Sequence, residues 1–484
     1  MCAAAALLFA SCGLRAQYIK YPESVKEAFA KADAQASPSS VARPMIGVTD
    51  PSLASSVVAA GGVPVMVFSD INDFNVLRDL AAGLDGFILS EDMKKPGESG
   101  ILLLKAIVDR NVPVLGSSPL FKSICDGVMR LPSDFSTVEG LVHKAATYKQ
   151  AKAIMGRCLT VDTHCDLPCE YDDGASIGRR FTNQVSVQKM TEGSLDAQFV
   201  VAYLRQGPVD VASSAAAVRK CDRILTELQD DVARVSDYCG IARTPAEAYA
   251  LRDQGKKAIF VAIENGYGIG NDISNIARYA ERGVTYMTLC HTRDNAICHT
   301  SSTYSEDTSK GLTPFGFKVV EELNRTGIVV DVSHASVGTF WDVYRTSKVP
   351  FVCSHSGAYA VYPHNRSLDD RQLRAIAEKN GVIQVFMVPD FMAVSSKVPK
   401  VSIKDYMDHM MHCIEVAGID HVGIGADFDG GGGGWGINGD NDIVNITVEL
   451  LERGFSEPDI RKILGENMMR VVSEVQAHAR NLTK

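Results

Sequence analysis

Histidine and carboxylate residues recur in this sequence directly after short apolar runs. The stretches with this pattern are Val161-Asp162-Thr163-His164-Cys165-Asp166, Ile263-Glu264, Leu289-Cys290-His291, Asp331-Val332-Ser333-His334, Cys353-Ser354-His355 and Ala426-Asp427-Phe428-Asp429. Imidazole and carboxylate ligands together suit Zn²⁺, and one carboxylate can bridge two ions. Each residue alone could be structural, as a lone histidine after a strand more often is. The six stretches taken together indicate a metal site.

The apolar runs before these residues are predicted to be strands of one (β/α)8 TIM barrel. Eight such segments occur, at 158–162, 197–204, 257–263, 284–290, 327–333, 350–354, 381–388 and 421–426. Helical patterns separate most of them, including an apolar stripe over 217–235 and a helix start at Ser456 and Pro458. Sites in such barrels form at the carboxyl ends of the strands. The predicted fold therefore gathers the six polar stretches at one rim.

Residues 43–136 are predicted to form a separate, small α/β domain. Short strands are expected at 45–48, 63–68, 86–89 and 112–116, with helical stretches such as 101–109 between some of them. Alternation of strands and helices indicates a parallel sheet. A chain of 484 residues has room for this domain and for a barrel that runs from about residue 141 to residue 484.

Composition limits the partners that the chain can bind. The formal net charge is −9 and no basic run occurs, which argues against nucleic acid as a partner. The sequence also lacks His-Glu-x-x-His and the Gly-Lys-Ser/Thr of a phosphate loop. A helix-borne protease zinc site and a nucleotide-binding P-loop are therefore excluded. Small molecules or peptides are the expected ligands.

Residues 1–17 resemble a bacterial export signal. Their apolar run, residues 3–10, is too short to span a bilayer, and small residues precede Cys12 as in a lipoprotein cleavage site. Cleavage after Ala16 is the alternative, and it would leave no lipid anchor. We therefore expect a bacterial cell-envelope, periplasmic or secreted protein, with lipid anchoring at Cys12 left open. Residues 18–42 are predicted to be a linker, and no other segment is long and apolar enough to be a transmembrane helix.

From about Leu159 to the C-terminus, the sequence resembles the membrane (renal) dipeptidase family of dizinc barrel hydrolases. The matching stretches are 161–166, 262–266, 286–291, 330–336, 354–359 and 423–430, six ordered motifs over some 270 residues. The resemblance implies hydrolysis of the peptide bond of dipeptides. It also implies two Zn²⁺ ions per chain and a metal-bridging hydroxide as the attacking group. Whether the chain forms a homodimer is left open.

The resemblance assigns the metal ligands. His164 and Asp166 would hold one zinc ion, and His334 and His355 would hold the other. Glu264 would bridge the two ions. Two cations that share a water molecule lower its pKa, so that hydroxide forms near neutral pH.

The resemblance also assigns residues that act on the substrate, and these complete the predicted catalytic set with Glu264. His291 would contact the oxygen that becomes negative during attack, Arg366 would bind the substrate carboxylate, and Asp427 would face the free amino terminus. The planar fork of arginine suits a carboxylate because it binds both oxygens. A site that holds both termini of a dipeptide should reject longer peptides.

Two other functions stay open at this point. One is a different metal-dependent amidohydrolase, such as a lactonase or deaminase, although those often begin with His-x-His where this chain has His164-Cys165-Asp166. The other is a zinc-binding barrel without turnover. Departures from the family pattern at Asn265-Gly266-Tyr267, at Arg293-Asp294 and in the glycine run 430–434 put the substrate preference in doubt.

The small domain is similar to a shortened class I glutamine-amidotransferase-like domain. The similar stretches are 46–49, 60–64, 84–89 and 113–116. In that family a nucleophilic cysteine follows the last of these, but Ser117-Ser118-Pro119 follows here. A Cys–His nucleophile therefore cannot be assembled, and the domain is predicted to be non-catalytic.

Overall fold

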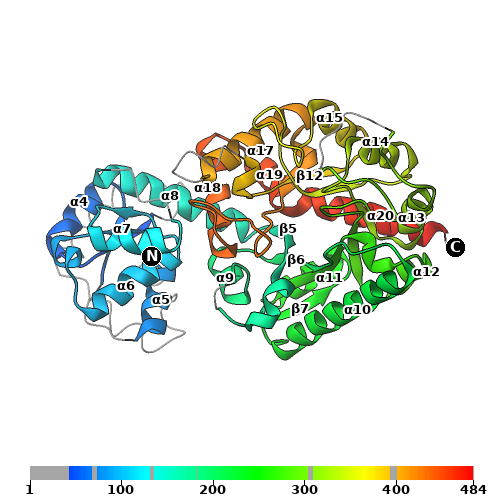
Figure 1. Cartoon of the computed structure of the whole chain (residues 1–484). Helices are drawn as coiled ribbons and strands as arrows, with labels where there is room; N and C mark the ends of the chain where they lie inside the picture. Colours follow the sequence, from blue (N-terminus) through cyan, green and yellow to red (C-terminus); the bar gives the residue numbers. More distant parts are fainter. Residues whose placement is uncertain are drawn as a thin grey trace. The chain divides into compact units, whose positions relative to one another are not determined.

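The computed structural model describes residues 43–67, 73–130, 136–180, 183–302, 309–392 and 401–482. The predicted signal segment 1–17 and linker 18–42 lie outside these residues. The chain divides into two compact units, Met1–Ile154 with Thr447–Gly454, and Met155–Ile446 with Phe455–Lys484. Figure 1 shows the N-terminal part of the small unit in blue and cyan, while its segment Thr447–Gly454 falls within the orange α18.

The first unit contains the expected parallel sheet, in the strand order β2-β1-β3-β4. Its strands are β1 (Met45–Val48), β2 (Val63–Met66), β3 (Gly86–Ile88) and β4 (Val114–Leu115), and its helices are α4 (Ala54–Ala59), α5 (Phe74–Ala82), α6 (Glu98–Asp109), α7 (Pro119–Gly127) and α8 (Val138–Met155). Ser118 caps α7 by accepting a hydrogen bond from Phe121 N at 3.1 Å. Its hydroxyl therefore stabilises the start of α7. The resemblance to the amidotransferase family stays a prediction.

The boundary between the units falls later than the sequence suggested. Residue 141, the expected start of the barrel, lies inside α8. Leu141 and Ala145 of that helix share a buried cluster with Ile46 and Val48 of β1. Helix α8 therefore covers the small sheet, and its apolar side chains are needed to complete that core.

The second unit is a parallel barrel of eight strands with helices around it (Figure 1). The strands are β5 (Val161–Cys165), β6 (Ala197–Tyr203), β8 (Lys257–Glu264), β9 (Val284–Thr288), β10 (Val329–Asp331), β11 (Val352–Ser356), β12 (Val382–Val385) and β13 (Val422–Ile424). They follow one another around the barrel in chain order, and a bridge between Cys165 and Phe428 joins the β5 and β13 edges. All eight expected segments are strands, so the predicted TIM barrel is confirmed.

Two details of the barrel differ from the prediction. The expected first strand at 158–162 is β5, three residues later, and a register shift between Asp162 and Cys165 interrupts its pairing with β6. His164 therefore lies within the strand. Strand β7 (Cys239–Ala242), which pairs with the first half of β8, was not expected from the sequence. Its two end residues are buried and the two residues between them are half-buried, so β7 lacks the alternation that marks a strand.

Helices surround the barrel and close its core. They are α9 (Val187–Glu192), α10 (Val211–Arg234), α11 (Pro245–Asp253), α12 (Ser274–Glu281), α13 (Pro314–Thr326), α14 (Val337–Thr346), α15 (Asp370–Glu378), α16 (Pro389–Met392), α17 (Ile403–Ala417), α19 (Glu457–Arg461) and α20 (Asn467–Leu482). Helix α18 (Val444–Glu452) begins in this unit, but its residues from Thr447 onward belong to the first unit. Met468 and Val472 of α20 join the main core cluster with Phe199 and Phe260 of the strands. Ser456 caps α19, as predicted from the sequence, and Asp210 caps α10.

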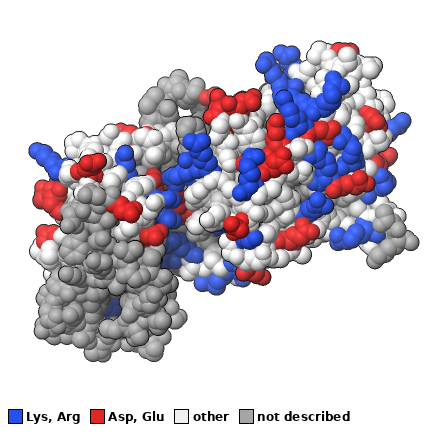
Figure 2. Space-filling model, turned by 90° about the horizontal axis from the view of Figure 1, so that it is seen from below, with Lys and Arg blue, Asp and Glu red and all other residues white. Residues whose placement is uncertain are grey.

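The surface carries both signs of charge. Figure 2 shows lysine and arginine interspersed with aspartate and glutamate on the visible face of the described residues. Many of these charges are paired, as in the contacts Arg278–Asp222 and Arg282–Asp222. Among the described residues, no helix combines the length and the apolar character needed to cross a bilayer.

Candidate active site at the carboxyl end of the barrel

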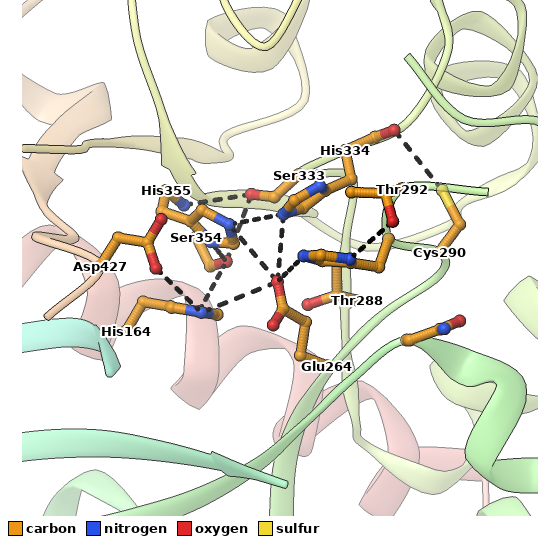
Figure 3. Close-up of polar contacts among 12 residues, drawn as sticks. His164, Glu264, Thr288, Cys290, Thr292, Ser333, His334, Ser354, His355 and Asp427 are labelled. Carbon is orange, nitrogen blue, oxygen red and sulfur yellow. Dashed lines mark hydrogen bonds and ion pairs between the residues drawn. The ribbon is translucent and has the colours of Figure 1, made fainter. Parts of the chain in front are cut away.

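The carboxylate of Glu264 lies at the centre of a cluster of histidines (Figure 3). Glu264 ends β8, and its Oε1 atom is 3.1 Å from Nε2 of His334 and 3.5 Å from Nε2 of His355. The two imidazole Nε2 atoms are 2.9 Å apart. Ligand atoms from β8, from β11 and from the loop after β10 therefore converge on one point.

A second group of ligand atoms surrounds His164 of β5. Its Nε2 atom lies 3.5 Å from Oδ2 of Asp166, 3.8 Å from Oε1 of Glu264 and 3.9 Å from Oδ1 of Asp427. The rings of His164 and His355 are 3.8 Å apart, so the two groups are adjacent. Glu264 is the residue that belongs to both.

Hydrogen bonds behind the cluster determine which nitrogen of each histidine faces it. Tyr286 OH donates to the carbonyl oxygen of Thr163 at 3.0 Å, so it accepts from Nδ1–H of His164 at 2.7 Å. Ser354 Oγ likewise donates to the carboxylate of Asp331 at 2.6 Å and accepts from Nδ1–H of His355 at 2.8 Å. Nδ1 of each ring therefore carries a proton, and Nε2 is the atom of each ring that faces the cluster.

The backbone is strained where it presents two of these side chains. His334 has a φ of 65° and Asp427 a φ of 64°, a region that residues other than glycine rarely adopt. Asn265, directly after Glu264, has a φ of 77°. Such strain, of order 1–3 kcal/mol per residue, persists only where the surrounding contacts enforce it, and it concentrates at functional sites.

The charge state of the cluster favours cations. Burial and the nearby Asp166 carboxylate hold the pKa of Glu264 well above its usual range. Burial also raises the pKa of Asp427 to about 7, although the charge of His164 opposes the shift. Three carboxylates in one buried place repel one another unless positive charge compensates them.

Two of the three histidines are in the neutral form that binds metal, whereas at His164 the carboxylates of Glu264 and Asp166 outweigh the effect of burial and raise the pKa to about 10. Burial, and then the charge of Arg366, lower the pKa of His334 well below its usual value, so the ring is neutral. Burial and the charges of His164 and Arg366 do the same for His355. A metal ligand must present a neutral imidazole, and both rings do.

The residues present therefore fit metal ions. Nε2 of His164 and Oδ1 of Asp166 are buried and make no hydrogen bond. Three groups of side chains each bring three potential ligand atoms within 4.8 Å of one another. The groups are His164 with Asp166 and Glu264, His334 with His355 and Glu264, and His164 with His355 and Asp427. The first two groups share Glu264 and contain all five side chains that the sequence proposed as ligands.

The cluster opens into a cavity of about 560 Å³. Its walls include Asp166, Glu264, His334 and Asp427, while His164 and His355 lie behind them, fully buried. The structure thus brings these predicted residues together around a space large enough for a dipeptide.

His291 and Arg366 line the same cavity. Nε2 of His291 lies 4.0 Å from Glu264 Oε1, and its Nδ1 atom is 3.3 Å from the hydroxyl of Thr292. Burial, with the charge of Arg366, lowers the pKa of His291 to about 4. A neutral His291 that accepts from Thr292 keeps its proton on Nε2, which can then donate into the cavity. Arg366 is nine-tenths buried and donates from Nη2 to the carbonyl oxygen of His355 at 3.3 Å.

Sequence reasoning missed the residues that hold the loops at this rim. Asn265 donates to the carbonyl oxygen of Leu204 at 2.8 Å and to Gln206 Oε1 at 3.1 Å. Asn295 donates to Asn265 Oδ1 at 3.0 Å and to the carbonyl oxygen of Leu289 at 2.9 Å. This amide network joins the ends of three neighbouring strands, β6, β8 and β9. The signal for this network in the sequence is Asn265-Gly266-Tyr267, which stands where the family pattern has small residues.

Gly430 lies so close to two carboxylates of the cluster that a side chain does not fit there. A Cβ atom at this position would lie 2.0 Å from Oδ2 of Asp166 and 2.5 Å from Oδ1 of Asp427. Any larger residue would displace those carboxylates. The rest of the glycine run is held by hydrogen bonds, since Gly432 N donates to the carbonyl oxygen of Asp427 at 2.7 Å.

Comparison with known proteins identifies the family. Residues 148–484 match the profile of the membrane dipeptidase family, peptidase family M19. The chain belongs to this family. It is therefore a metallopeptidase that hydrolyses dipeptides, and the predicted resemblance is confirmed.

Individual relatives agree with the family. The chain is 29% identical to dipeptidase tcpJ of Claviceps purpurea (strain 20.1) over 313 residues, which are 63% of this chain and 73% of the relative. It is 26% identical to the probable dipeptidase PvdM of Pseudomonas aeruginosa, with a TM-score of 0.64 over 69% of this chain and 99% of that one. It is 25% identical to a metallopeptidase described as dipeptidase AC, with a TM-score of 0.61 over 66% of this chain and 99% of that one.

Proposed function

We propose that this metallodipeptidase is a dizinc enzyme that holds a dipeptide by both of its termini. The convergence of His334 and His355 on the Glu264 carboxylate carries the proposal, since two neutral imidazole Nε2 atoms 2.9 Å apart are arranged for a cation. Imidazole and carboxylate ligands together suit zinc. His164 and Asp166 would complete the site of the second ion. When bound, two zinc ions lower the pKa of a shared water and polarise the scissile carbonyl.

The side chains of this chain supply the remaining steps. Glu264 and Asp427 carry the negative charge that balances the cations, and Asp427, at the cavity wall, also faces the ammonium group of the substrate. His291 donates from Nε2 to the oxygen on which negative charge develops. One such donor typically contributes around 3 kcal/mol to the stabilisation of the transition state.

Arg366 binds the substrate carboxylate. Its guanidinium is buried, and its pKa is lowered by that burial while Asp427 and Glu264 oppose the shift. Arginine stays protonated in proteins even where it is buried. A buried cation that lines the cavity and makes a single 3.3 Å hydrogen bond with a carbonyl has donors to spare for a carboxylate.

Metal analysis combined with a dipeptide assay tests the proposal. Purified protein should contain about two zinc ions per chain and hydrolyse Gly- or Ala-containing dipeptides. Incubation with a chelator should abolish the activity, and added Zn²⁺ should restore it. Zinc-replete protein that hydrolyses no dipeptide would refute the proposal and would leave a zinc-binding barrel without turnover.

A further inference from the structure

Two stacked aromatic rings at the substrate cavity have no role in the reaction described above. His364, in the loop after β11, and Phe391, in α16, both line the cavity, and both are half-buried. Their ring centroids are 4.5 Å apart, and the ring planes meet at 18°. Phe386, which is fully buried, packs against Phe391 with ring centroids 5.8 Å apart. The pair is therefore held in place as a rigid aromatic wall of the cavity, the His364–Phe391 wall.

This wall lies beside the group that binds the substrate carboxylate. Cζ of Arg366 is 5.7 Å from the centre of the Phe391 ring, and the backbone N of Arg366 donates to Nδ1 of His364 at 3.2 Å. In a dipeptide, the Cβ atom of the C-terminal residue is two bonds, or about 2.5 Å, from the α-carboxylate carbon. A side chain whose own carboxylate is bound by Arg366 therefore begins within reach of the wall.

The wall offers an uncharged surface. Burial and the charge of Arg366 lower the pKa of His364, although Asp390 opposes the shift, so the imidazole is neutral at neutral pH. The side chain of Phe391 has no polar atom. Aromatic rings attract other rings in offset or edge-to-face contacts, and they bury apolar side chains well. A lysine side chain would gain no ion pair from the two rings and would bring its ammonium group toward the charge of Arg366.

We propose that the His364–Phe391 wall contacts the side chain of the C-terminal residue of the dipeptide and selects aromatic and large apolar side chains. The inference rests on the proposed function, because Arg366 must bind the α-carboxylate for that side chain to reach the wall. Phe391 is then a specificity-determining residue. The preferred substrates end in phenylalanine, tyrosine or leucine, and dipeptides that end in lysine are poor substrates.

The substitution Phe391→Ala tests the wall. The measurement is the ratio of kcat/KM for Gly-Phe to kcat/KM for Gly-Gly, determined for each zinc-loaded enzyme. Because the C-terminal residue of Gly-Gly has no side chain, effects on metal binding and on the chemical step cancel in this ratio. Phe391→Leu keeps most of the apolar volume and provides the measurement where the alanine variant does not fold. Phe317→Ala is the control, since Phe317 is an exposed residue of α13 and does not line the cavity.

The unaltered enzyme and the Phe317→Ala control should show a ratio of about ten or more, and both should hydrolyse Gly-Lys more slowly than Gly-Phe. Phe391→Ala should lower the ratio roughly tenfold, because the ring of the substrate loses its main apolar contact. Phe391→Leu should lower it less. A ratio near one in the unaltered enzyme, or a ratio that neither substitution at Phe391 changes, would overturn the proposal.

A binding measurement tests the wall without turnover. The ligand 3-phenylpropanoate has the carboxylate and the ring of a C-terminal phenylalanine but no peptide bond, and propanoate lacks the ring. At equal concentration and ionic strength, 3-phenylpropanoate should raise the Tm of the zinc-loaded protein more than propanoate does. This difference should shrink in Phe391→Ala and persist in Phe317→Ala. Equal shifts for the two ligands would overturn the wall. Failure to hydrolyse any dipeptide, with the difference in Tm present, would instead refute the proposed function.

Discussion

The substitution Glu264→Gln should weaken metal binding and leave the shape of the site unchanged. It keeps the size of the side chain and removes one negative charge. The Oε1 atom of Glu264 lies between 3.1 and 4.0 Å from four imidazole Nε2 atoms, so the charge is close to every point where a cation could bind. At an effective dielectric constant of about 20, two unit charges about 4 Å apart interact by on the order of 4 kcal/mol, and a unit charge and a divalent ion by about twice that. We therefore expect the affinity for each ion to fall by about 10³-fold or more.

The assay is zinc content after gel filtration in metal-free buffer, together with hydrolysis of Gly-Ala. The variant should retain less than one zinc ion per chain and show no activity above background. Glu192→Gln is the control, because Glu192 is also buried but pairs with Arg180, away from the site. It should keep both zinc ions and full activity. A Glu264→Gln enzyme with two tightly bound ions would refute the bridging role.

Three further changes have defined outcomes. Arg366→Ala should lower kcat/KM for free-acid dipeptides by about 10²-fold or more, since it removes a charged, bidentate contact, and an equal loss for C-terminally amidated dipeptides would contradict the carboxylate contact. Gly430→Ala should weaken zinc binding, because its Cβ would lie 2.0 Å from Asp166 Oδ2, whereas Gly97→Ala, with no atom within 4 Å, should not change zinc content. Burial lowers the pKa of His409 to about 4, so the unfolded chain takes up a proton below pH 6.5 that the folded protein does not. The neutral His409 therefore contributes about 3 kcal/mol to the free energy of unfolding above pH 6.5, and this contribution is lost as the pH falls from 6.5 to 4. In a His409→Gln variant, the free energy of urea-induced unfolding should therefore fall less steeply as the pH is lowered over this range. A fall as steep as in the unaltered protein would show that other groups cause the pH dependence.

The barrel and the positions of its polar residues could be predicted because each depends on local patterns. Eight short apolar runs with helical stretches between them specify the strands, and the connectivity of such barrels fixes their order. Once the strands are known, residues at their carboxyl ends must lie at one rim. For this reason His164, Glu264 and His355 could be assigned to one place from the sequence.

Other features could not be predicted because they depend on contacts between segments far apart in the chain. The Nδ1 protons of His164 and His355 are set by Tyr286 and Ser354, which the sequence does not distinguish from ordinary core residues. Gly430 is one of five consecutive glycines in the sequence, which does not show that a Cβ atom at this position would lie 2.0 Å from the Asp166 carboxylate. The position of α8 on the small sheet likewise follows from tertiary packing.

The anchoring of the protein and its location stay predictions. The proposed signal segment and Cys12 lie outside the described residues. A bacterial cell-envelope, periplasmic or secreted location follows only from the resemblance of residues 1–17 to an export signal. Assembly as a homodimer and the non-catalytic role of the first unit also remain to be tested.

The central claim is that His164, Asp166, Glu264, His334 and His355 hold two divalent ions. Anomalous diffraction from crystals of zinc-loaded protein, recorded on both sides of the zinc absorption edge, tests this most directly. Two peaks should appear, each about 2.0–2.2 Å from its imidazole and carboxylate ligand atoms, with Glu264 in contact with both. A single peak, or a zinc ion bound without one of these five side chains, would contradict the account.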